Sequence, residues 1–149
     1  MTLARLIAAG FGAGYAPLAP GTVASAAAVL TGAGLLAVSP WLLAASALLA
    51  TVGGVWAVQA SRVDGDPGWV VIDEFAGQWI AMLALGHVSA LGLLLAFALF
   101  RLFDITKPGP VGWADRQHGA IGIMADDVIA GIIAAALLWL LQWVWPNLA

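Results

Sequence analysis

The stretch ALGLLLAFALFRLFDITKPGP, from Ala90 to Pro110, joins an uncharged apolar run to a cluster of charges. Its first eleven residues carry no charge, and the next seven hold Arg101, Asp104 and Lys107. The whole chain of 149 residues has only five Lys or Arg and eight Asp or Glu. A long apolar segment that ends in scarce charges is typical of a helix that leaves the hydrocarbon core of a bilayer. The stretch therefore predicts a membrane helix with a polar end.

The composition of the whole chain supports this interpretation. Hydrophobic residues make up 63% of the sequence and charged residues 9%, against about 25% charged in an ordinary soluble domain. The mean hydropathy is +1.02. A soluble fold of this size has too little interior for so many apolar side chains, so the sequence predicts an integral membrane protein with a single domain over residues 1–149. The absence of cysteine excludes disulfides, thiolate metal sites and cysteine nucleophiles.

The predicted fold is an all-α, compact bundle of about five short transmembrane helices. Some apolar segments are shorter than the roughly 20 residues that a full span needs, so local thinning of the bilayer is one expectation. The N-terminal segment is broken by glycines and Pro17, which favours a short interfacial helix over a cleaved signal peptide. The five predicted spans cover residues 21–38, 41–60, 70–85, 90–103 and 127–145.

The basic residues predict the orientation of this bundle. Five crossings would place segments 1–21, 61–73 and 104–126 on one side of the membrane. The positive-inside rule makes that side cytoplasmic, because all the basic residues lie there or at the adjoining helix ends. They are Arg5, Arg62, Arg101, Lys107 and Arg116.

The acidic residues predict a metal site on the same side. All eight lie between Asp64 and Asp127, in two blocks separated by an uncharged stretch over residues 75–100. The predicted topology brings both blocks to one membrane face, where so many carboxylates would repel one another unless a cation joined them. Oxygen ligands in a chain without cysteine favour Mg²⁺. The candidate ligands are Asp73, Glu74, Asp104, Asp126 and Asp127.

Simpler roles for these acids stay open at this point. Asp73 could merely cap the third predicted helix, and Asp126 and Asp127 could cap the fifth, which they are expected to open. Glu74 and Gln78 are four residues apart and share a helix face.

Two basic side chains and one helix start favour phosphate as the ligand. Arg101 and Lys107 stand beside the acids, where basic residues more often bind an anion held together with a metal than act as anchors that snorkel to the interface. Free N–H groups where a helix begins at Gly21 and Thr22 can also bind an anion, although threonine is an ordinary cap as well. His118 is a possible proton donor, but a lone loop histidine is more often solvated.

Three segments together resemble the phosphatidylglycerophosphatase A family. They read FGAGYAPLAPGTVAS, VIDEFAGQWIAML and FRLFDITKPGPVGWADRQHGAIGIMADDVIAG, and the resemblance runs from about Gly10 to Gly131. It implies a small phosphatase of the bacterial inner (cytoplasmic) membrane that depends on Mg²⁺, crosses the membrane several times and has its active site on the cytoplasmic face. It also implies hydrolysis of phosphatidylglycerophosphate to phosphatidylglycerol and phosphate in phospholipid biosynthesis.

The family motifs carry specific residues over to this chain. The departures are Gly109 where the family usually has tryptophan, Ala24 where glycine is usual and Ala120 where glycine is frequent, and none removes a charge. We expect catalytic roles for Asp73, Arg101, Asp104 and Lys107, and phosphate binding by Gly21, Thr22, Arg101 and Lys107. The motif positions that match are Thr22, Asp73, Glu74, Arg101, Asp104, Lys107, Pro108, Asp126 and Asp127.

The sequence leaves mechanism and some alternatives open. Either a water activated beside Mg²⁺ attacks the phosphate, or an aspartate such as Asp104 forms an aspartyl-phosphate. A small transporter or ion pathway that uses the intramembrane acids is the alternative function, and a non-catalytic assembly subunit is a third. The expected partners are the lipid substrate and the bilayer, with no nucleic acid, and the oligomeric state is undetermined.

Overall fold

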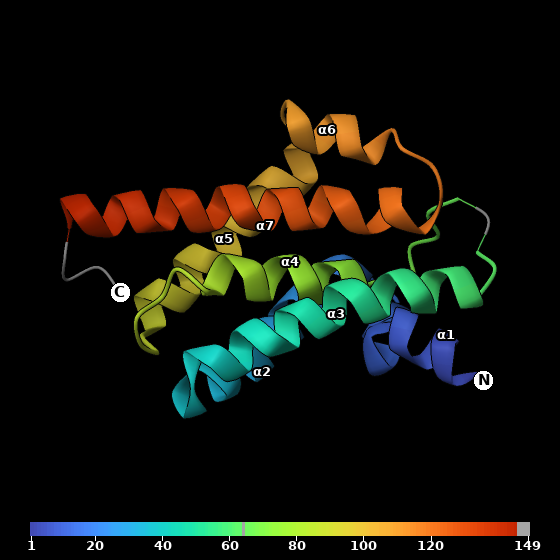
Figure 1. The fold of residues 1–149 in the computed structure, drawn as a ribbon, viewed down its shortest axis with the longest axis horizontal. Coiled ribbons are helices and arrows are strands. Elements are labelled where there is room, and N and C mark those ends of the chain that lie inside the picture. Colours follow the sequence, from blue (N-terminus) through green and yellow to red (C-terminus); the bar gives the residue numbers. More distant parts are fainter. Residues whose placement is uncertain (64, 146–149) are drawn as a thin grey trace.

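The structure, a computed structural model, describes residues 1–63 and 65–145 and is all-helical over these residues. This confirms the predicted helical class. Figure 1 shows α7 lying along α4, with α2 and α3 on the other side of α4. The elements are α1 (Leu3–Ala8), the short 3-10 helix η1 (Gly10–Tyr15), α2 (Pro20–Val38), α3 (Pro40–Ala60), α4 (Ile72–Met82), α5 (Ala90–Thr106), α6 (Pro110–Asp115) and α7 (Gly119–Val144).

Three of these helices are long and apolar enough to cross a membrane, namely α2, α3 and α7. The other two predicted spans correspond to α4 with 11 residues and α5 with 17 residues. α4 is amphipathic, and eight of its residues are buried in the protein. Its short length therefore reflects a helix that is covered mainly by other helices.

Local sequence signals set the ends of α2, α3 and α5. The Ser39 hydroxyl accepts a hydrogen bond from the Trp41 N–H, and Pro40 starts α3, so the predicted turn between α2 and α3 is confirmed. α5 ends before Lys107, whose backbone is left-handed with φ 46° and ψ 53°. Pro108 disfavours helical geometry at Lys107, so the helix does not continue through it.

The prediction that Asp126 and Asp127 open the last helix is wrong. α7 begins at Gly119, seven residues before Asp126, and its first turn contains no acid. Residues 119–125 contain no proline that would stop a helix, and Gly122 lets the first turn pack closely against the Gln117 carbonyl. Asp126 and Asp127 therefore lie inside α7, and helix capping does not account for either of them.

Two glycines bring α4 and α7 into backbone contact. A Cβ atom on Gly131 would lie 2.3 Å from the Gly77 carbonyl oxygen, and one on Gly77 would lie 2.5 Å from the Asp127 carbonyl oxygen. Both distances are too short for any side chain, so this approach requires glycine in both helices. The two helices run in the same direction (Figure 1), so the contact also brings the start of α4 beside Asp127.

Candidate active site

Three carboxylates converge where α4 begins beside α7. One oxygen atom from each of Asp73, Glu74 and Asp127 lies within 4.8 Å of the others. Asp73 is 7% exposed and Asp127 is 3% exposed. Three negative groups at this spacing in a buried place are unfavourable unless protons or a cation offset their charge.

The hydrogen bonds of this cluster do not satisfy all its carboxylate oxygens. Asp73 accepts a hydrogen bond of 3.1 Å from the Glu74 N–H. The Oε2 atom of Glu74 is buried and makes no hydrogen bond to any residue that the structure describes. A buried oxygen without a partner is energetically costly, and all the possible metal ligands here are carboxylate oxygens. The cluster could therefore hold a hard divalent cation such as Mg²⁺.

Arg101 joins this cluster to the start of α2. Its guanidinium group forms an ion pair with Asp104 and lies 4.0 Å from Glu74 Oε1. It also lies 3.4 Å from the Thr22 hydroxyl oxygen and 3.5 Å from that of Ser25. The Ser25 hydroxyl donates a hydrogen bond of 2.8 Å to the Gly21 carbonyl. The guanidinium group and the Thr22 hydroxyl are therefore the donors that lie beside the three carboxylates.

Gly21 allows α2 to approach this group. A Cβ atom at Gly21 would lie 2.2 Å from Glu74 Oε1 and 3.4 Å from an Arg101 nitrogen. Any side chain there would displace the Glu74 carboxylate, so the position is confined to glycine by the site itself.

Lys107 carries the second positive charge. Its Nζ atom lies 2.5 Å from Asp115 Oδ1 and 2.6 Å from Asp126 Oδ2. Burial lowers the pKa of Lys107, but its hydrogen bonds to these two carboxylates outweigh that effect and raise the pKa above the ordinary value. The lysine is therefore protonated throughout the physiological pH range.

A pocket of about 260 Å³ collects nearly all the residues predicted from the sequence. Thr22 is the exception among them, and it lies beside Arg101 at the exposed start of α2. The predicted residues that line the pocket are Gly21, Asp73, Glu74, Arg101, Asp104, Lys107, Asp126 and Asp127.

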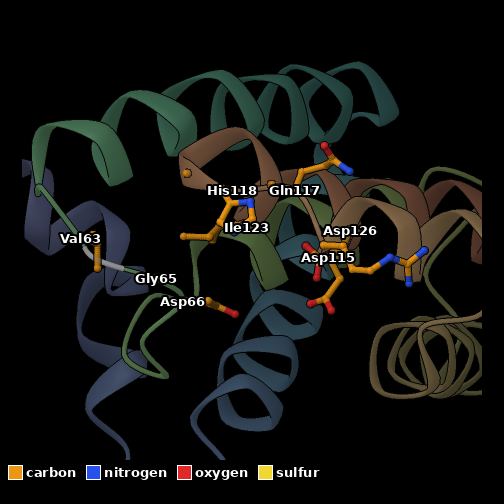
Figure 2. A pocket seen from close by; sticks show the side chains of 11 residues that line it. Val63, Gly65, Asp66, Asp115, Gln117, His118, Ile123 and Asp126 are labelled. Atoms are coloured by element: carbon orange, nitrogen blue, oxygen red, sulfur yellow. The ribbon is translucent and has the colours of Figure 1, made fainter.

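A larger pocket of about 610 Å³ adjoins the first and shares Asp66 and Asp126 with it. Figure 2 shows Asp115 and Asp126 side by side at one wall, with Asp66 on a separate loop. His118 lines this larger pocket and not the smaller one, so the structure does not place the possible proton donor beside the three carboxylates.

The sequence did not identify Asp66 and Asp115 as site residues. Burial raises the pKa of Asp66, Lys107 opposes that effect, and the Asp115 and Asp104 carboxylates add to it. Asp66 lies in a loop rich in Gly and Pro, and a break in the helix at Pro108 separates Asp115 from Lys107, so neither shows a helical spacing to a predicted residue. The only sequence signal that could have indicated Asp66 and Asp115 as site residues was their charge, because the chain has few charged residues.

A family model described as Phosphatidylglycerophosphatase A matches residues 6–142. The chain belongs to this family. An *Escherichia coli* (strain K12) protein named Phosphatidylglycerophosphatase A is 38% identical over 146 residues, which cover 95% of this chain and 85% of the relative. A *Haemophilus influenzae* protein of the same name is also 38% identical, over 93% of this chain and 88% of the relative.

A third relative has a different name. A *Bacteroides thetaiotaomicron* protein, "Putative phosphatidylinositol-3-phosphatase", is 38% identical over 93% of both chains. No solved structure matches this chain. Membership of the family confirms the prediction of a phosphatase of phospholipid metabolism in a membrane and favours it over the transporter and assembly alternatives.

Proposed function

We propose that this protein hydrolyses phosphatidylglycerophosphate to phosphatidylglycerol and inorganic phosphate with Mg²⁺ as cofactor. The observation that carries the proposal is the single pocket in which three convergent carboxylates adjoin Arg101 and Lys107. Carboxylates alone would repel a phosphate, and a phosphate site made of basic residues alone would not require three convergent carboxylates. Both groups together are expected of a site that binds a metal and a phosphate. The names of the *E. coli* and *H. influenzae* relatives support the choice of lipid.

Asp73, Glu74 and Asp127 are the residues that would hold the metal, because their oxygens converge and one of them lacks a partner. Bound there, Mg²⁺ would supply positive charge that polarises the phosphate and offsets its repulsion by the acids. Asp104 and Asp126, predicted as further ligands, line the same pocket and are paired with Arg101 and Lys107. Their part in metal binding stays a prediction.

The basic residues bind and orient the phosphate in this proposal. The fork of Arg101 holds two non-bridging oxygens, and the Thr22 hydroxyl lies near enough to Arg101 to donate to the same group. Lys107 approaches from the side of Asp126. These donors stabilise the charge that develops on the phosphate oxygens during transfer.

We also propose the position of the bundle in the bacterial inner membrane. α4 and α5 complete a five-helix bundle, and α1 with η1 lies at the interface, where Leu3 and Phe11 are exposed. α2 and α4 begin, and α5 ends, at the site. Because the basic residues gather at this end, the site faces the cytoplasm.

The test of the proposed function is phosphate release from phosphatidylglycerophosphate by the purified protein in detergent. We expect release with Mg²⁺ and at least about a hundredfold less in EDTA, since the carboxylates would then repel the substrate. Asp104→Asn should reduce the Mg²⁺-dependent rate, because Arg101 loses the charge that orients it. Phosphatidylinositol 3-phosphate and phosphatidic acid serve as comparison substrates.

Absence of release from folded protein would contradict the proposal. Equal release in EDTA would contradict the metal, and faster release from phosphatidylinositol 3-phosphate would contradict the choice of substrate.

Attack by water is the version of the mechanism that we propose. Both Asp104 and Arg101 are partly buried and form an ion pair, and a paired carboxylate is a weaker nucleophile than a free one. In water labelled with heavy oxygen, a single turnover should place one labelled atom in the released phosphate, with no phosphoenzyme after acid quenching. A trapped aspartyl-phosphate that Asp104→Asn abolishes would instead establish the covalent route.

A further inference from the structure

An apolar groove runs along the outside of the bundle between α2 and α5. Its volume is about 290 Å³, and its lining contains no polar side chain. Leu30 is 75% exposed and Leu94 is 61% exposed, so the groove opens toward the surroundings of the protein and not toward its core. The lining residues are Ala26, Val29 and Leu30 from α2, and Leu93, Leu94 and Phe97 from α5.

The groove is aligned with the phosphate site along both helices. On α2, Thr22, Ala26 and Leu30 follow one another at intervals of four residues and so lie along one face. On α5, Arg101, Phe97 and Leu93 do the same in the opposite direction of the chain. Arg101 lies 3.4 Å from the Thr22 hydroxyl oxygen, so the phosphate-binding donors stand at one end of the groove.

From these observations we infer that the groove between α2 and α5 seats an acyl chain of the lipid whose phosphate headgroup lies at Arg101. The inference rests on the proposed function, because it takes the substrate to be a phospholipid. Thr22 and Leu30 are eight residues apart, so the path from donor to deep end is about 12 Å long at 1.5 Å per residue. A chain in this groove lies parallel to the helices, as acyl chains do in a bilayer leaflet.

The groove orients the substrate more than it adds affinity. Lipid tails are as apolar as leucine, so an acyl chain gains little by leaving the bilayer for the groove. A fixed chain does, however, restrict where the headgroup can lie, and correct placement of a reacting group contributes strongly to rate.

A second apolar pocket of about 300 Å³ provides a comparison. Its walls come from α1, η1, α3 and α4, and none of Gly21, Thr22 and Arg101 lines it. Because it is not continuous with the donors that would hold the phosphate, a chain seated there would not bring a headgroup to Arg101.

The first test fills the groove. Ala26 is the smallest of its lining residues, and Ala26→Phe should lower kcat/KM for dioleoyl phosphatidylglycerophosphate at least about tenfold. The same variant should keep its rate on the dibutanoyl form, whose chains are too short to reach past Ala26. Ala37→Phe is the matched control, because Ala37 is also an exposed alanine of α2 and lies eleven residues farther from the site; it should match wild type on both substrates.

An equal loss on both substrates, or no loss on either, would overturn the inference. Wild-type protein that hydrolyses neither substrate would contradict the proposed function but would not test acyl-chain binding in the groove. A second measurement that does not depend on activity is therefore needed.

The second test uses photo-crosslinking with Mg²⁺ present and with the terminal phosphate of the probe replaced by a phosphonate, which cannot be hydrolysed. A phosphatidylglycerophosphate with a diazirine midway along one acyl chain should react mainly with residues 26–30 and 93–97, and Ala26→Phe should reduce this labelling. A phosphatidylcholine with the same diazirine should label the exposed apolar helices evenly. An even distribution from both lipids would show general contact with the bilayer and would overturn the inference.

Discussion

Asp127→Asn is expected to lower Mg²⁺-dependent phosphate release by about a thousandfold, the loss typical of a deleted charge-stabilising group at an active site. Asn keeps the size of the side chain but removes the charge that, with Asp73 and Glu74, would hold the metal. The metal-free variant should nevertheless melt a few degrees higher than wild type, because two buried carboxylates repel one another less than three do.

Thermal unfolding with and without Mg²⁺ separates these effects. Mg²⁺ should raise the melting temperature of the wild-type protein, since a ligand that binds only the folded state stabilises it, and should raise that of Asp127→Asn much less. Asp115→Asn, which neutralises an exposed carboxylate outside the three-residue cluster, is the matched control and should lose less than about tenfold. Equal responses of wild type and Asp127→Asn to Mg²⁺ would contradict the assignment.

Gly131→Ala should have the second largest effect, although it adds only one methyl group. That methyl would lie 2.3 Å from the Gly77 carbonyl oxygen, so α4 and α7 must move apart. Overpacking of this kind costs about 1–3 kcal/mol, and displacement of Asp127 from Asp73 by about 1 Å can cost a hundredfold in rate. The measurements are the melting temperature followed by circular dichroism and the rate of phosphate release.

Gly53→Ala is the control for this substitution. A Cβ atom at Gly53, in the middle of α3, meets no other atom within 4 Å. Alanine is favoured over glycine in a helix by up to about 1 kcal/mol, so this variant should be as stable as wild type or more stable. A Gly131→Ala protein that is equally stable and active would show that the α4–α7 contact does not position the carboxylates.

The sequence was most informative where a single local signal decides a structure. The predicted spans 21–38 and 41–60 agree with α2 and α3 to within a residue, because Pro20, Ser39 and Pro40 fix their starts. It was least informative at Asp126 and Asp127, since acids are common at helix starts and the apolar residues 119–125 gave no separate boundary. The stability of two acids inside a helix comes from tertiary partners, which local propensity does not include.

The gathering of the acids and bases could also be predicted, because the topology brings the relevant helix ends together. The sequence could not predict which of the acids share the three-carboxylate cluster and which pair with the basic residues. Asp127 joins Asp73 and Glu74 while its neighbour Asp126 pairs with Lys107. Which acid faces which partner depends on the rotation of α7 about its axis. The contact between Gly77 and Gly131 fixes that rotation, and these two residues are 54 positions apart in the sequence.

The shortness of α4 has a consequence for how the protein is made. Eleven residues span about 16 Å, roughly half of the hydrocarbon core, and the first turn carries Asp73 and Glu74. Such a segment is a poor candidate for insertion by itself, and the helix that it contacts most, α7, is translated later. α4 therefore reaches its final depth only after α7 has entered the bilayer, so a nascent chain arrested before Gly119 should leave residues 72–82 accessible to water-soluble labelling reagents.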